Sequence, residues 1–116
     1  MISEMETTVY QDLAQQILAR PPRLGRTRLV AIDGPSGSGK TTFAERLARA
    51  FPFEVPVVHT DDLLDGWADQ FTFWPRLERC LLTPLRSSRP GRYRRYDWLR
   101  GEFAGPWIEV PPVPVV

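Results

Sequence analysis

The sequence contains very little cysteine and no long apolar run, and each scarcity excludes a class of protein. Cys80 is the only cysteine, so no internal disulfide can form and a reducing compartment is expected. No apolar stretch approaches the roughly 20 residues that span a bilayer. The first residues are partly acidic and carry no apolar segment, unlike a secretory signal. These absences predict a cytoplasmic protein that has no membrane partner.

Lysine is almost absent as well. Lys40 is the only lysine among 15 basic residues, and all the others are arginine. Arginine favours planar, bidentate contacts with phosphate or carboxylate, although an excess of arginine can also reflect genome composition. The formal net charge of +1 provides no overall field that would attract nucleic acid. With 116 residues, of which 42% are hydrophobic, the chain has the composition of one small globular domain.

Apolar spacing and prolines divide the chain into short elements. Met5, Val9 and Leu13 recur at helical spacing and predict an amphipathic helix over 4–19, which ends before Pro21. The other expected elements are a strand over 27–33, a helix over 40–51, a strand over 53–60, a helix over 73–85, and two extended pieces, 92–98 and 106–110, that pair as a hairpin.

Residues 34–41, GPSGSGKT, match the pattern G-x-x-x-x-G-K-[ST], which binds phosphate. Glycines allow the backbone to wrap around an anion, so that successive N–H groups point at phosphate oxygens. A helix that starts near Lys40 adds its positive end, Lys40 contacts the outer phosphates, and the Thr41 hydroxyl can bind magnesium. The pattern therefore predicts ATP and Mg²⁺ as ligands. The predicted ATP-binding residues are Gly34, Pro35, Ser36, Gly37, Ser38, Gly39, Lys40, Thr41 and Thr42.

The second expected strand ends in VVHTDDLL, which places Asp61 and Asp62 at its carboxyl end. In a fold with a phosphate loop, that end of the neighbouring strand faces the nucleotide. A carboxylate there can accept a proton from an attacking hydroxyl or hold magnesium. A carboxylate pair at a strand end is also a common helix cap. The residues alone leave both interpretations open.

Three segments resemble uridine kinase and its relatives, a group that includes pantothenate kinase and phosphoribulokinase. The segments are AIDGPSGSGKTTFAERLA, VVHTDDLL and RYDW. The resemblance implies that Lys40 and Asp61 are catalytic, with Asp61 as the base that deprotonates the acceptor hydroxyl. It also implies that Thr41 and Asp61 are magnesium ligands. Asp62, Tyr96 and Asp97 are then expected near the acceptor.

The same resemblance implies an α/β fold of the P-loop NTPase class, with a partial parallel sheet, flanking helices and a small β-hairpin insertion at about 91–110. It covers roughly residues 28–116, and it leaves 1–27 as an amphipathic helix and linker. In the family, a Glu-Gly pair and an arginine-bearing lid follow the third core strand, whereas the printed sequence ends at Val116. We expect either the front part of a longer kinase or a shortened relative. In the shortened form, the first strand keeps an open apolar edge that invites pairing with a second copy.

Two functions follow as hypotheses. The first is a phosphotransferase that passes the γ-phosphoryl group of ATP to a hydroxyl of a nucleoside-like small molecule. The second is a nucleotide-binding module or truncated remnant without transfer activity, which the missing lid favours. A transporter-type ATPase shares the GPSGSGKTT motif, but it requires an LSGGQ-like signature that the sequence lacks.

Several single residues carry weaker signals. Arginines interleaved with aromatic residues over 92–98 can bind single-stranded nucleic acid, but a hairpin with solvent-facing arginines is favoured. Asp69 is a candidate contact to an acceptor hydroxyl. Cys80 is expected to be inert packing within an apolar helix.

Overall fold

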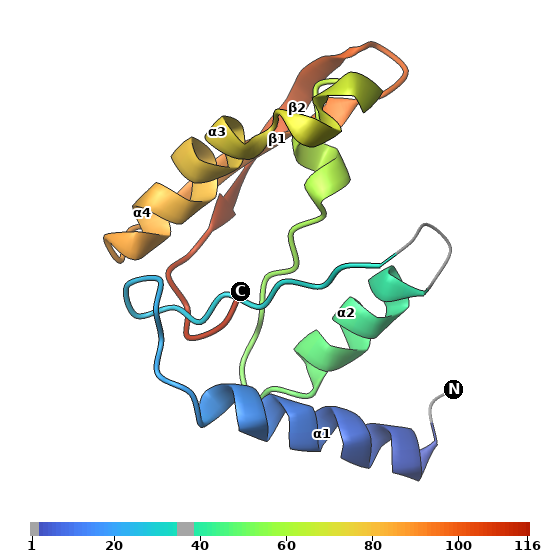
Figure 1. Cartoon of the computed structure of the whole chain (residues 1–116), viewed down its shortest axis with the longest axis vertical. Helices are drawn as coiled ribbons and strands as arrows, with labels where there is room; N and C mark the ends of the chain where they lie inside the picture. Colours follow the sequence, from blue (N-terminus) through green and yellow to red (C-terminus); the bar gives the residue numbers. More distant parts are fainter. Residues whose placement is uncertain (1–2, 35–38) are drawn as a thin grey trace.

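The computed structural model describes residues 3–34 and 39–116. It contains helices, short 3-10 and π-helical turns, and one hairpin (Figure 1). In chain order the elements are α1 (Glu4–Leu18), α2 (Lys40–Arg49), the 3-10 turns η1 (Thr60–Leu63) and η2 (Trp67–Phe71), α3 (Trp74–Leu77), the π-helical turn η3 (Glu78–Leu82), α4 (Thr83–Arg86), β1 (Gly91–Asp97) and β2 (Glu102–Val110).

Helix α1 confirms the helix expected over 4–19. The Ser3 hydroxyl caps it by accepting a hydrogen bond from the Glu6 N–H at 3.1 Å, and acidic side chains in the first turn favour the positive end of the helix dipole. Helix α1 packs against α2, which confirms the helix expected over 40–51. The division of the chain between residues 27 and 28 remains a prediction. No helix in the described ranges is both long and apolar enough to cross a bilayer.

The packing of α1 on α2 forms one of two apolar clusters. Ala14, Leu47, Phe51 and Val115 are buried there, so the cluster joins both helices to the last described residues. Apolar side chains from the segments 30–32 and 53–55 pack around it. This cluster fixes the position of α2 and therefore of Lys40 at its first residue.

The second cluster lies between the hairpin and a helical segment over 74–86. Within this segment α3, η3 and α4 follow one another without a break, which confirms the helix expected over 73–85 but adds a π-helical turn. The fully or nearly fully buried side chains are Leu24, Leu63, Leu64, Phe73, Leu81, Leu85, Tyr93 and Val110. Figure 1 shows this part and the α1–α2 pair on opposite sides of the extended segments that connect them.

Strands β1 and β2 pair antiparallel, from Gly91 opposite Val110 to Asp97 opposite Glu102. The hairpin expected at about 91–110 is thus present, with a connection over 98–101 rather than over 99–105. The register shifts where Tyr93 pairs with Ile108 but Arg95 pairs with Ala104, so β2 carries extra residues there.

The predicted P-loop NTPase fold with a partial parallel sheet is wrong. The only sheet in the described residues is the antiparallel pair β1–β2, and the segments 27–33 and 53–60 are not strands. A single isolated parallel bridge joins Arg28 to Val115. Proline explains part of this outcome, because it donates no backbone hydrogen bond and disrupts a central strand. Pro56 interrupts 53–60, and three prolines lie within 111–114.

Candidate phosphate-binding site

The two ends of the phosphate motif are described, and its middle is not. Gly34 and the residues from Gly39 to Thr42 belong to the described chain. The predicted ATP-binding residues Pro35, Ser36, Gly37 and Ser38 lie outside the described residues. The described part of the site therefore consists of the residues that flank 35–38.

Gly39 precedes α2 in a left-handed conformation, with φ at +85°. A side chain strains such a backbone, which is why glycine suits this position. Gly39 is the N-cap residue of α2, and no side chain at this position accepts a hydrogen bond from the first N–H groups of the helix. Thr41 and Thr42 are exposed in this first turn. The start of α2 thus presents backbone donors, hydroxyls and the positive end of the dipole.

Lys40 links the end of the motif to its beginning. Its ammonium group donates a hydrogen bond to the carbonyl oxygen of Gly34 at 2.8 Å. The Gly34 N–H in turn donates to Oδ1 of Asp33 at 2.8 Å. Gly34, with which the motif begins, is therefore held against the side chain at the start of α2. This contact brings the only lysine of the chain to the place where the motif requires a cation.

A pocket of about 280 Å³ lies at this contact. Its lining contains Ile32, Asp33, Gly39, Lys40 and Phe43. The ring of Phe43 packs against Tyr10 of α1, with ring centroids 5.5 Å apart, so the α1–α2 contact supports one wall. The pocket combines one cation, one carboxylate (Asp33), the end of a helix and an apolar wall, and the cation and the helix end are the features that attract a phosphate.

Asp61 and Asp62 lie in η1, which packs against β1. Asp61 is exposed, and the hydrogen bonds and ion pairs of the described residues do not join it to Lys40 or Thr41. Oδ2 of Asp62 lies 3.5 Å from Nε of Arg95 in an ion pair. Within the described ranges, no three His, Cys, Asp or Glu side chains gather into a metal site. Magnesium usually keeps waters and phosphate oxygens and takes only one or two protein ligands, so the Thr41 hydroxyl fits such a site.

The remaining predicted substrate residues lie in the hairpin. Oδ1 of Asp97 accepts hydrogen bonds from the N–H groups of Leu99 and Arg100, at 3.0 and 3.1 Å, and so orders the β1–β2 connection. The ring of Tyr96 packs edge-on against Trp98 and Phe103, at centroid distances of 4.9 and 5.2 Å. In this arrangement both residues stabilise the hairpin.

Asp69 has a clearer role than the sequence indicated. It accepts hydrogen bonds from the Asp65 N–H at 3.0 Å and the Thr72 hydroxyl at 2.7 Å, and it pairs with Arg76. These three contacts, in that order, lower the pKa of Asp69 to about 2. Sequence reasoning missed this network, because no local pattern indicates that Asp69 and Arg76 meet.

Comparisons of the chain with protein-family models, with curated proteins and with solved structures found no match. The site's own geometry is therefore the basis for a functional proposal.

Proposed function

We propose that this protein binds the phosphate tail of a nucleotide such as ATP through residues 34–42. The observation that carries the proposal is the 2.8 Å hydrogen bond from Lys40 to Gly34 at the start of α2. An arriving phosphate offers Lys40 a stronger, charge-assisted partner than a neutral carbonyl oxygen. The left-handed Gly39 and the adjoining pocket support the same ligand.

The proposal includes Mg²⁺ bound together with the nucleotide. The exposed Thr41 hydroxyl at the first turn of α2 is the protein ligand we assign to it. When bound, the ion neutralises charge on the phosphates. The protein residues hold the tail through Lys40 and the first N–H groups of α2.

A second candidate function is transfer of the γ-phosphoryl group to a hydroxyl of a nucleoside-like acceptor, as in uridine kinase-like enzymes. The exposed position of Asp61 favours it, because a general base must be accessible to its substrate. This candidate needs Asp61 to approach the nucleotide, and no contact among the described residues provides that approach. Nucleotide binding without transfer is therefore our first proposal.

A cytoplasmic location belongs to this proposal, because ATP is available there and the single cysteine suits a reducing compartment. Pairing of two copies through an open edge of the first strand is not proposed. Its premise was a strand over 27–33, and the described residues contain none there.

Isothermal titration calorimetry with ATP and magnesium tests the binding proposal. Lys40→Ala removes the only cation at the pocket and is expected to weaken ATP binding at least about tenfold. Arg49→Ala, which removes an exposed cation from the last turn of the same helix, is the matched control and should bind like the parent. Equal binding by Lys40→Ala and the parent would reject the site.

The transfer candidate needs a separate measurement. Phosphorylation of a nucleoside panel is followed for the parent, Asp61→Asn and Asp65→Asn, all at saturating ATP. Asp65 is another exposed carboxylate, close in sequence to Asp61, and serves as the control. If Asp61 is the base, only Asp61→Asn loses transfer while ATP binding is unchanged. If Asp61→Asn transfers as fast as the parent, the base assignment is wrong.

A further inference from the structure

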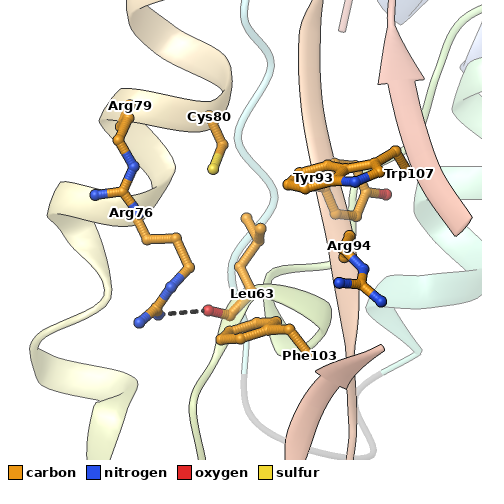
Figure 2. A pocket seen from close by; sticks show the side chains of 8 residues that line it. All are labelled: Leu63, Arg76, Arg79, Cys80, Tyr93, Arg94, Phe103 and Trp107. Atoms are coloured by element: carbon orange, nitrogen blue, oxygen red, sulfur yellow. Dashed lines mark hydrogen bonds between the residues drawn. The ribbon is translucent and has the colours of Figure 1, made fainter. Parts of the chain in front are cut away.

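A second pocket, of about 230 Å³, lies between the helical segment 74–86 and the hairpin (Figure 2). This pocket adjoins the apolar cluster between the hairpin and the segment 74–86, whereas the phosphate motif adjoins the α1–α2 cluster. Its lining contains Leu63, Arg76, Arg79, Cys80, Tyr93, Arg94, Phe103 and Trp107. Three arginines and three aromatic rings thus gather in a small space.

Two irregular features of the backbone, a π-helical turn and a register shift, lie on opposite sides of this pocket. On the helical side, η3 is a π-helical turn that contains Arg79 and Cys80. On the hairpin side, the register shift after Tyr93 allows the consecutive residues Tyr93 and Arg94 both to line the pocket. π-helical turns and β-bulges are unfavourable interruptions that occur preferentially at functional sites. Their convergence on one pocket is a reason to look for a ligand there.

The arginines of the pocket differ in whether a nearby carboxylate already neutralises their charge. Arg76 is paired with Asp69, and its Nη1 also donates to the carbonyl oxygen of Leu63 at 2.8 Å, as Figure 2 shows. Arg94 donates through Nε to the Gly105 carbonyl oxygen at 3.0 Å, which leaves its charge uncompensated. Within the described residues, Arg79 and Arg94 form no ion pair with a carboxylate. The pocket therefore has an excess of positive charge.

Aromatic rings hold two of these guanidinium groups. Arg76 lies over the Phe103 ring, 4.8 Å from its centroid, and Arg94 lies over Trp107 at 5.8 Å. Stacking uses the flat face of a guanidinium and leaves its N–H edge available for in-plane hydrogen bonds. A planar carboxylate is the partner that fits such an edge in bidentate fashion.

The size and walls of the pocket restrict the rest of the ligand. Pockets for drug-sized ligands measure roughly 300–1,000 Å³, so 230 Å³ suits a single ring. Leu63 and Tyr93 are almost fully buried and form an apolar wall, and Figure 2 shows Cys80 projecting toward the hairpin from the other side. A flat ring between such walls gains aromatic contacts that a bare anion does not.

We propose that this pocket binds a small aromatic carboxylate, with the carboxylate on Arg94 and the ring among Tyr93, Phe103 and Trp107. This site does not depend on nucleotide binding at residues 34–42. Binding of the two ligands can therefore be tested separately, and Lys40→Ala should leave the aromatic carboxylate site unchanged.

Titration with benzoate, followed by NMR of the full chain, tests the proposal. We expect signals of Tyr93, Phe103 and Trp107 to shift with a dissociation constant on the order of 1 mM, since a one-ring ligand makes few contacts. Benzamide lacks the charge and acetate lacks the ring, and each should bind about tenfold more weakly or worse.

Variants locate the carboxylate. Arg94→Gln should weaken benzoate binding about tenfold, whereas Arg89→Gln, at an exposed position before β1, should not. Glutamine keeps the aliphatic stem of arginine and removes its charge, and circular dichroism checks that each variant folds. The proposal fails if benzoate shifts none of the three aromatic signals. It also fails if acetate or inorganic phosphate binds as tightly as benzoate, or if Arg89→Gln has the same effect as Arg94→Gln.

Discussion

Asp69 forms an ion pair with Arg76 that joins the η2 turn to the helical segment 74–86. The Asp65 N–H and the Thr72 hydroxyl add hydrogen bonds, and together these contacts lower the pKa of Asp69 from its ordinary value to about 2. The network holds Arg76 at the edge of the pocket proposed for an aromatic carboxylate.

This network predicts an acid-dependent loss of stability. Because the pKa of Asp69 is lower in the folded state, the unfolded chain takes up a proton first as the pH falls. The stabilisation is fully present above about pH 4 and disappears as the pH falls toward about 2. When urea unfolding is measured between these pH values, the free energy of unfolding should decline less with falling pH for Asp69→Asn than for the parent. The control Asp65→Asn changes an exposed carboxylate and keeps the backbone N–H that donates to Asp69, so its free energy of unfolding should decline like that of the parent.

The burial of Tyr93 leads us to predict a loss of stability at alkaline pH. Burial raises the pKa of Tyr93, and the nearby Asp62 charge raises it further, while Arg95 partly opposes this. Above the unfolded pKa of about 10, the unfolded chain loses the phenol proton first, so stability decreases as the pH rises. In Tyr93→Phe, the free energy of unfolding should decline less than in the parent between about pH 9.5 and 11. Urea unfolding across this range measures the difference. An identical decline in both proteins would contradict the prediction.

Thr27 is fully buried, and its hydroxyl has no hydrogen-bond partner among the described residues. A buried hydroxyl without a partner costs about 1–3 kcal/mol of stability. Thr27→Val keeps the shape and should raise the free energy of unfolding by about 1 kcal/mol. The comparison Thr72→Val removes a hydroxyl that donates to Asp69 and should lower stability instead. If both variants shift the unfolding midpoint in the same direction, this assignment is incorrect.

Gly91 begins β1 where the strand touches η3. A Cβ atom at this position would lie 2.7 Å from the Cys80 carbonyl oxygen and 2.9 Å from Cδ2 of Leu81. Backbone cannot yield as a flexible side chain does, so Gly91→Ala should lower the free energy of unfolding by about 1–3 kcal/mol. Thermal unfolding measures the change. An unchanged melting temperature would show that the hairpin and the helix are packed less closely than the structure indicates.

The sequence predicted local elements better than their assembly. The helix over 4–19 follows from apolar spacing and the stop at Pro21, and α1 has nearly those bounds. The segments 27–33 and 53–60 have strand-like composition, but strands require partners. The prolines at 56 and within 111–114 remove donors that a central parallel sheet would need. The predicted P-loop NTPase sheet was an inference from motif resemblance, and it does not form in the described residues.

The candidate sites show the same limit. The motif predicted that Lys40 and Thr41 begin a helix, and α2 begins at Lys40. This part of the pattern could be predicted because it depends only on neighbouring residues. The contacts of Asp62 with Arg95 and of Asp69 with Arg76 are set by packing between distant segments. The arginine pocket depends on a π-helical turn and a register shift, neither of which leaves a recognisable sequence pattern.

The central claim is that Lys40 binds the phosphate tail of a nucleotide. Because Lys40 is the only lysine, labelling the protein with ¹⁵N- and ¹³C-lysine gives a single side-chain NMR signal that reports this residue alone. We predict that ATP with magnesium shifts this signal saturably as the ammonium leaves the Gly34 carbonyl oxygen, and that adenosine does not. A signal that stays in place up to millimolar ATP, or that moves equally with adenosine, would contradict the account.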